Sequence, residues 1–507
     1  MKPFYITALT FLNYLFFAQD PSTRIVTGTA SIGVSAISTQ TLVAKTYQIL
    51  FPIYGYGTDS ASHLFIFSAH EKTEEGDDAV SRGFIGTFDM VGDSVNWTFA
   101  SNYYELTQSG NYVFFSNDDK TTRYNKLHGF VELNYPERLI YTLPSLDKTF
   151  LYKSDAKDIV SCVKISDGTT EWSAPVPGTE NWVDVRETPD SILLVAASGL
   201  HAIRPRSGVV WSYPLSTATV VSKALTYSLV NQNSAIRRVS KIIKTLDDDV
   251  RVTELASNIL VDNNVVFFAA REKMIAVTME GKLLWELDLK GYPVSKMFLS
   301  KRGSSLMLIN FGLARYGENY VTHGSPFAMN VDPQTGVVKY HNALTGIENL
   351  VDFSNDGKLL IFAGKNTILE VKEGSNQVDT LILDGAKYGN FAEFIDGNIY
   401  YAEREGFYVP LNFINSDNIY FRVDNNKVYG LDKNGFNYSF HYTDIYKLEK
   451  RFDDKLILLS QNKSLVLNSN RELLCTIDLG DKPVVMGKRI YFVGKQIIHS
   501  LNVEDIK

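Results

Sequence analysis

The sequence predicts an all-β protein, a single β-propeller of about eight four-stranded blades, within a range of roughly seven to nine. Three observations lead to this fold class. The chain of 507 residues is rich in Tyr (28) and Phe (30) and holds only 15 Pro, and aromatic side chains suit the half-buried surface of a strand. A hairpin-like unit recurs along the chain. Its spacing of roughly 35 to 50 residues is that of propeller blades.

Each repeat consists of an apolar strand, a turn that contains Gly, and a second strand that carries an aromatic residue. The Gly supplies the positive φ that a tight hairpin requires. One repeat is too small to bury its own apolar face, so the repeats must stack. We expect the aromatic residue to cover its hairpin and to dock on the next repeat. The clear copies hold Gly168 with Trp172, Gly208 with Trp211, Gly281 with Trp285 and Gly336 with Tyr340, and a weaker copy holds Trp97.

The two ends of the chain are expected to meet in one blade. The last predicted strands, over residues 489–493 and 496–501, have no aromatic hairpin after them. We expect a strand from within residues 23–50 to complete their blade and close the ring, which removes sheet edges that would otherwise pair with other chains. The predicted organisation is a signal peptide over 1–18 and one propeller over 19–507.

The Gly turn followed by Val-Val-Trp or Leu-Leu-Trp resembles the PQQ-like repeat, the family of quinoprotein dehydrogenases and of BamB-like outer-membrane assembly propellers. The resemblance covers most of residues 80–345. It implies a β-propeller, a fold that hosts many unrelated functions. The dehydrogenases of this family use a disulfide between adjacent cysteines, a calcium site and a catalytic aspartate, and this sequence has no adjacent cysteines. We therefore expect no bound cofactor and no dehydrogenase activity.

One segment, residues 234–246, interrupts the strand pattern. Its apolar residues recur at helical spacing: Ile236, Val239, Ile243 and Leu246. The segment is therefore predicted to be a short amphipathic helix on a face of the propeller. Its basic residues are candidate contacts for a partner: Arg237, Arg238, Lys241 and Lys244. The alternative is a solvated insertion that packs on its own blade.

The N-terminus predicts export. Lys2 precedes a mostly apolar run over residues 4–18, and Gln19 and Asp20 follow it. A short basic region, an apolar stretch too short to span a bilayer comfortably, and a small residue before a polar start are typical of a cleavable signal peptide. The predicted location is periplasmic or secreted, and the protein is not expected to be an integral membrane protein. The alternative is a cytoplasmic protein whose first residues form a buried strand or helix.

The residue types that catalyse reactions or bind metals form no recognisable pattern. Cys162 and Cys475 lie far apart, and two buried unpaired thiols are favoured over a disulfide. None of the eight histidines stands at a metal-ligand spacing, so no metal site is predicted. The net charge of −7, with both signs interspersed, lacks the basic surplus that nucleic-acid binding requires.

These observations favour a non-enzymatic, protein-binding scaffold of the cell envelope, for example a subunit of an outer-membrane assembly or secretion complex. Aromatic residues between the predicted strands suit protein interfaces, although they could equally cap the blades: Tyr54, Tyr56, Tyr103, Tyr104, Trp182, Tyr316 and Tyr320. Trp182 is the one of these that we group with the basic segment as a partner contact. The alternative function is an enzyme or carbohydrate-binding propeller with a site in its central channel, which no linear motif would reveal.

Overall fold

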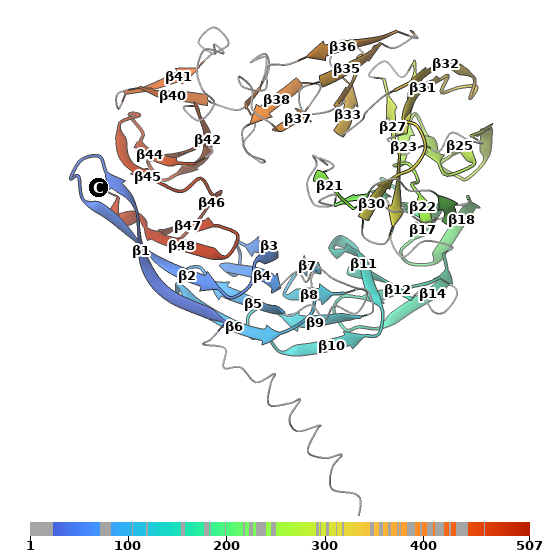
Figure 1. The fold of residues 1–507 in the computed structure, drawn as a ribbon. Helices are drawn as coiled ribbons and strands as arrows, with labels where there is room; N and C mark the ends of the chain where they lie inside the picture. Colours follow the sequence, from blue (N-terminus) through green and yellow to red (C-terminus); the bar gives the residue numbers. More distant parts are fainter. Residues whose placement is uncertain are drawn as a thin grey trace, which may run out of the picture. The chain divides into compact units, whose positions relative to one another are not determined.

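The computed structural model is an all-β chain (Figure 1). It describes residues 24–506 apart from 71–82, 104, 118–119, 154–157, 177–181, 183, 198, 216–218, 223–226, 230–239, 245–249, 290–293, 295, 301–303, 311, 317–318, 345–348, 354–357, 363–366, 373–374, 376, 383–390, 396–397, 403–408, 411–419, 425–426, 432–444 and 461. Within these residues the only helical turns are 3-10 turns, η2 (Pro144–Leu146) and η5 (Val503–Asp505). The expected signal peptide lies outside them.

The chain divides into two compact units. The first comprises residues 1–151, 165–168 and 415–507, and the second comprises residues 152–164 and 169–414. The repeated element is a sheet of four antiparallel strands, and the described part of the chain contains seven separate sheets of this kind. Such a sheet is the blade of a β-propeller, and the predicted fold class is confirmed.

The strands of these seven sheets follow one another along the chain. Two sheets lie in the first unit: β3 (Ile53–Asp59), β4 (Leu64–His70), β5 (Gly83–Asp89) and β6 (Ser94–Ala100); β7 (Glu105–Ser109), β8 (Tyr112–Ser116), β9 (Thr121–Asn125) and β10 (Val131–Tyr135). The next sheet is β11 (Arg138–Leu143), β12 (Lys148–Lys153), β13 (Ile159–Lys164) and β14 (Thr170–Pro175). The second unit holds four more: β15 (Asp184–Glu187), β16 (Leu193–Ala197), β17 (Gly199–Arg204) and β18 (Gly208–Pro214); β23 (Leu260–Asp262), β24 (Val265–Ala269), β25 (Lys273–Thr278) and β26 (Leu283–Asp288); β27 (Lys296–Leu299), β28 (Leu306–Asn310), β31 (Phe327–Val331) and β32 (Val338–Ala343); β33 (Asn349–Phe353), β34 (Lys358–Phe362), β35 (Thr367–Lys372) and β36 (Val378–Ile382). A three-stranded sheet follows: β37 (Phe391–Ile395), β38 (Asn398–Ala402) and β39 (Val409–Pro410).

The position of a strand within its sheet explains its sequence. In several sheets the second and third strands are apolar and buried along their length, as in β16 and β24, because both of their faces are covered. The fourth strand alternates between exposed and half-buried residues, as in β26, because one face meets solvent. The core of each unit therefore lies between its sheets.

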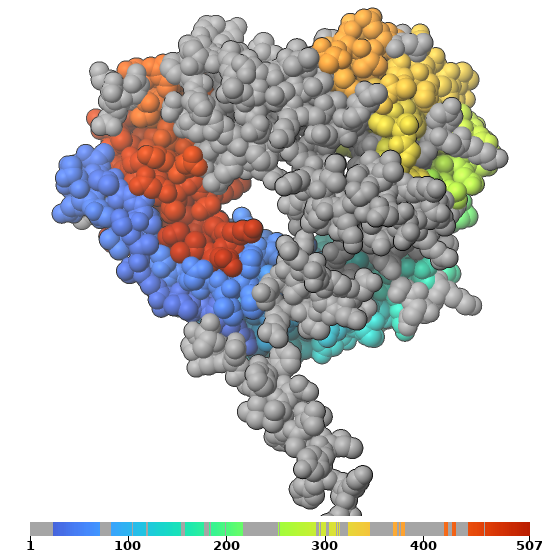
Figure 2. Space-filling model, viewed as in Figure 1, coloured from blue at the N-terminus to red at the C-terminus, as the bar shows by residue number. Residues whose placement is uncertain are grey.

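The first and last strands of the first unit belong to one sheet of 11 strands. Its members are β1 (Ile25–Ser35), β2 (Thr41–Ile49), β40 (Tyr420–Asp424), β41 (Lys427–Leu431), β42 (Ile445–Phe452), β43 (Lys455–Leu459), β44 (Ser464–Asn468), β45 (Leu473–Ile477), β46 (Pro483–Met486), β47 (Arg489–Val493) and β48 (Ile497–Asn502). β2 pairs with β48, and β1 pairs with both β2 and β45. Figure 2 shows these N-terminal (blue) and C-terminal (red) strands side by side. Closure of a complete ring stays a prediction.

A sheet of six strands in the second unit has no counterpart among the blades. Its strand order is β19-β22-β29-β30-β20-β21. One insertion, between β18 and β23, supplies β19 (Thr219–Ser222), β20 (Tyr227–Leu229), β21 (Ser240–Lys244) and β22 (Val250–Glu254). A second insertion, between β28 and β31, supplies β29 (Leu313–Tyr316) and β30 (Asn319–Thr322). We call this the added sheet.

The added sheet corrects one prediction. Residues 240–244 of the expected helix form strand β21, which pairs with β20, and residues 234–239 and 245–246 lie outside the described part. The segment is rich in β-branched residues, which favour strands. Apolar residues at helical spacing were outweighed by the pairing that β20 offers.

A β-bulge lies at the same place in seven hairpins. Six of them join the third and fourth strands of four-stranded sheets, and the seventh joins β44 and β45 of the 11-stranded sheet. The residue left unpaired directly precedes the position at which the repeat aromatic stands: Asn96, Glu132, Glu171, Val210, Leu284, Lys339 and Leu474. A bulge inserts one extra residue and bends its strand, which redirects the side chain that follows. In this chain it aims the aromatic residue away from its own hairpin.

Candidate functional site

Four of the five repeat aromatics link one blade to the next. Each indole Nε1 donates a hydrogen bond to a backbone carbonyl in the third-to-fourth hairpin of a following sheet. The pairs are Trp97 with Lys126 (2.9 Å), Trp172 with Pro205 (2.8 Å), Trp211 with Met279 (3.1 Å) and Trp285 with Pro333 (3.0 Å). Tyr340 stands in the same position on β32, after its bulge. The four tryptophans therefore hold the scaffold together and are not free to bind a partner.

The hairpin between the third and fourth strands contains a residue with positive φ. Five hairpins use glycine there: Gly129, Gly168, Gly208, Gly281 and Gly336. At three of them a Cβ would lie under 3 Å from the docked indole, so the position requires both the conformation and the small size of glycine. Two hairpins of the first unit depart from this pattern. They hold Asp93 (φ 52°) and Arg471 (φ 65°).

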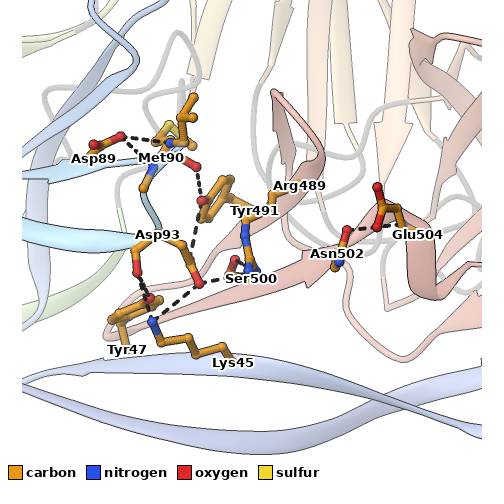
Figure 3. Close-up of polar contacts among 12 residues, drawn as sticks. Lys45, Tyr47, Asp89, Met90, Asp93, Arg489, Tyr491, Ser500, Asn502 and Glu504 are labelled. Carbon is orange, nitrogen blue, oxygen red and sulfur yellow. Dashed lines mark hydrogen bonds and ion pairs between the residues drawn. The ribbon is translucent and has the colours of Figure 1, made fainter.

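Asp93 lies at the centre of a polar cluster that joins the first and last strands of the first unit (Figure 3). Its side chain is 7% exposed, and its Oδ2 lies 3.4 Å from Nζ of Lys45 and 3.2 Å from Nη1 of Arg489. Its backbone carbonyl accepts hydrogen bonds from the Tyr47 hydroxyl (2.6 Å) and from Lys45 (2.8 Å). Tyr491 donates to the backbone of the same turn. Two cations compensate one buried carboxylate, which gives the cluster a structural role.

The two tyrosines of this cluster are locked as hydrogen-bond donors. Burial raises the pKa of the Tyr47 hydroxyl well above its usual value, and the negative charge of Asp93 raises it further. The same two causes raise the pKa of Tyr491. Both hydroxyls therefore stay protonated near neutral pH and can donate their hydrogen bonds.

The added sheet is tied to a blade of its own unit by Glu254, the last residue of β22. The Glu254 side chain is 11% exposed, and its two oxygens each lie 2.9 Å from a partner nitrogen, Nε2 of His323 and Nε of Arg271. Arg271 lies in the turn between β24 and β25, and His323 follows β30. A carboxylate held by an arginine and a histidine fixes this end of the sheet.

The predicted partner contacts fall into three groups. Lys241 and Lys244 lie in β21, which is an end strand of the added sheet. Arg237 and Arg238 lie outside the described residues. Trp182 is half-buried just before β15. The structure thus brings Lys241 and Lys244 onto one sheet edge and does not bring Trp182 to an exposed position.

The aromatic residues expected between strands mostly lie in or beside strands. Tyr54 and Tyr56 belong to β3, and each is 49% exposed. Tyr103 is buried, and its hydroxyl shares a 2.6 Å hydrogen bond with Oγ1 of Thr122. Tyr316 and Tyr320 belong to β29 and β30 of the added sheet, and Tyr104 lies outside the described residues. Only Tyr54 and Tyr56 are observed as exposed rings.

Both cysteines are buried, and neither forms a disulfide. Cys162 donates a hydrogen bond to the Pro205 carbonyl that also receives Trp172. Burial raises the pKa of the Cys475 thiol to about 12, so this thiol stays protonated and unreactive. Among the described residues, no His, Cys, Asp and Glu side chains gather in a group of three that could hold a metal ion.

Comparison with known proteins finds no matching family model and no matching curated protein. Among solved structures, BamB from Moraxella catarrhalis is similar with a TM-score of 0.36 and 11% identity, over 66% of this chain and 92% of that chain. The computationally designed Ika8 protein has a TM-score of 0.28 and 11% identity, over 78% of this chain and 95% of that one. The dihydro-heme d1 dehydrogenase NirN, in complex with DHE, has a TM-score of 0.35 and 12% identity, over 72% of this chain and 74% of that chain. At these values function has to be argued from the chain's own residues.

The described residues contain no helix of the length and apolar character that a bilayer span requires.

Proposed function

We propose that this chain is an exported β-propeller that acts as a protein-binding scaffold of the cell envelope, within an assembly or secretion complex. The observation that carries the proposal is the added sheet. A blade needs four strands, whereas the added sheet is built from two further insertions. Segments that a scaffold does not need for its own packing are where binding functions concentrate. The apolar run over residues 4–18 supports export.

The end strands of the added sheet supply the means of binding. β19 and β21 each pair on one side only among the described strands, and an unpaired strand edge can accept an extended segment of another protein. Lys241 and Lys244 place basic residue types on one of these edges. Lysine on an edge opposes pairing between identical copies and favours an acidic partner segment.

A charge-reversal experiment tests this proposal. The double substitution Lys241→Glu and Lys244→Glu alters the β21 edge. Lys282→Glu, in the exposed turn between β25 and β26, is the matched control. We expect tagged wild-type protein and the control to recover the same partner from envelope extracts, and the double variant to recover about tenfold less of it. Equal recovery by all three proteins, or no partner with any of them, contradicts the proposal.

A further inference from the structure

Arg471 is the second residue that stands where five other hairpins have glycine. Unlike Asp93, which is paired with Lys45 and Arg489, it forms no ion pair with a described residue. Arg471 lies in the turn between β44 and β45 at φ 65°. This left-handed conformation is unfavourable for a long side chain and is readily adopted by glycine. The turn itself is held by Asn468, whose carbonyl accepts from the Arg471 N–H (3.0 Å) and whose Oδ1 accepts from the Glu472 N–H (2.9 Å). The Arg471 side chain is therefore not what shapes the turn.

The Arg471 guanidinium lies over an apolar floor. Its Cζ is 5.9 Å from the centre of the Phe421 ring. Phe421 (2% exposed) and Leu456 (8% exposed) line a surface depression of the first unit together with Arg451, at the end of β42. Ser469 adds a hydroxyl. Two arginines and an apolar floor therefore share one depression.

Neither arginine of the depression is neutralised by an ion pair with a described carboxylate. Lys455 is paired with Asp454, with Nζ 2.8 Å from Oδ1. Within the described part of the chain, no carboxylate forms an ion pair with Arg451 or Arg471. Asp453 is the remaining acidic residue of the lining. Among the described residues of the lining, three cations stand against two carboxylates, which gives them a net positive charge.

We propose that this depression binds an acidic peptide segment, in which a Glu or Asp carboxylate meets Arg451 and Arg471. A guanidinium presents a planar fork of donors that matches a carboxylate. A phosphate dianion is disfavoured because Asp453 and Asp454 repel its second charge. This inference rests on the proposed function in one respect: the ligand is taken to be a segment of a protein because the chain is proposed to bind proteins. It places that segment in the first unit, whereas the added sheet belongs to the second.

Two synthetic peptides test the site directly. Acetylated and amidated Gly-Leu-Glu-Leu-Gly is titrated into the full-length protein by calorimetry at low salt, and the same peptide with Gln in place of Glu is the control ligand. We expect saturable binding of the Glu peptide, and binding of the Gln peptide that is weaker by about tenfold or more, because a hydrogen bond to a charged group is stronger than a neutral one.

Matched variants assign the binding to the two arginines. Arg471→Gly inserts the residue that five equivalent hairpins use. It is expected to keep or raise the melting temperature while weakening the Glu peptide by about tenfold. Arg451→Gln is expected to weaken it similarly, whereas Lys463→Gln, at an exposed lysine of the same unit, should bind as the wild type does.

Three results would overturn the proposal: equal binding of the Glu and Gln peptides, undiminished binding to Arg471→Gly, or no binding to the wild type. None of these would affect partner capture through β21. Conversely, if no partner is captured from envelope extracts but the Glu peptide still binds, the proposed function is contradicted and this peptide site is still supported.

Discussion

Trp285 stabilises the second unit in two separable ways. Its Nε1 donates to the Pro333 carbonyl at 3.0 Å, and its ring packs where a Cβ on Gly336 would lie 2.7 Å away. Trp285→Phe removes the hydrogen bond and keeps an aromatic ring, so we expect a loss of about 1 kcal/mol in the free energy of unfolding. Trp285→Ala should cost about 3–5 kcal/mol. Urea unfolding measures both, and equal costs would show that the ring does not pack as described.

Gly281 is expected to tolerate no side chain, and Gly324 provides its control. Both have positive φ, 85° and 77°. A Cβ on Gly281 would lie 2.5 Å from Cγ of Trp211, whereas a Cβ on Gly324 would meet nothing within 4 Å. Gly324→Ala therefore carries only the backbone cost, about 1 kcal/mol. Gly281→Ala should cost about 1–3 kcal/mol more, and thermal unfolding that ranks the two variants equally would refute the docking of Trp211.

Asp59 predicts a loss of stability in acid. Burial alone would raise its pKa, but the hydrogen bonds from Ser62 and Lys126 and the charge of Lys126 outweigh burial and lower the pKa to about 2. A group whose pKa is depressed by folding stabilises the protein above its unfolded pKa, near 4, and loses that contribution as the pH falls toward 2. Asp59→Asn should remove a contribution on the order of 1 kcal/mol at pH 7. It should also flatten the decline between about pH 4 and pH 2; an unchanged decline would assign acid sensitivity to other groups.

The sequence predicted the repeated hairpin because its Gly and its aromatic residue stand a few positions apart. The glycine against which each indole packs lies on another hairpin, as Gly336 does for Trp285. It could not predict the cluster around Asp93. Lys45, Asp93 and Arg489 are far apart in the sequence and follow no motif, so only the pairing of the first and last strands brings them together. Arg471 was missed for a related reason. Its turn lacks glycine. In a weakly matching repeat, a missing glycine does not by itself indicate that the residue in its place has a function.

At the scale of elements, β1 joins two strands that would otherwise be edges. Its Gly33 pairs with Ile477 of β45, and a Cβ there would lie 2.0 Å from the carbonyl oxygen of Thr476. Gly33→Ala should therefore separate β1 from β45, at a cost of about 1–3 kcal/mol. Hydrogen exchange should speed up at the amides of Cys475–Ile477. Gly28→Ala, which meets only the side-chain oxygen of Thr46 at 3.1 Å, should leave those amides protected; faster exchange in both variants would contradict the role of Gly33.

Strand β21 and the repeated bulge show where sequence patterns stop being informative for elements. Ile236, Val239 and Ile243 fit a helical period, yet β-branched residues also suit strands, and over so short a segment the partner strand decides. A bulge adds a single residue, which the alternation of a strand of five to seven residues does not reveal. Both features are set by pairing across the sheet and not by the segment alone.

At the scale of the whole molecule, repetition made the fold class predictable. Four clear copies of one hairpin were enough to imply stacked blades, because a single copy cannot bury its own apolar face. The added sheet could not be predicted in the same way, since its two insertions are far apart in the sequence and resemble no repeat.

The export proposal has its own test at this scale. If residues 1–18 are a signal peptide, the mature protein recovered from the envelope or the medium should begin at or near Gln19. Removal should leave the blades intact, because β1 begins at Ile25. N-terminal sequencing decides the matter, and an intact Met1 on the recovered protein would contradict export.

The central claim, an exported scaffold that binds protein through its added sheet, is tested most directly by site-specific photo-crosslinking in cells that make the full chain. A crosslinking amino acid replaces Lys241 in one strain and Lys282 in another, and mass spectrometry identifies what is attached. We expect one envelope protein to be crosslinked to the chain from position 241 and not from position 282. No crosslinked protein at position 241, or the same set of proteins at both positions, would contradict it.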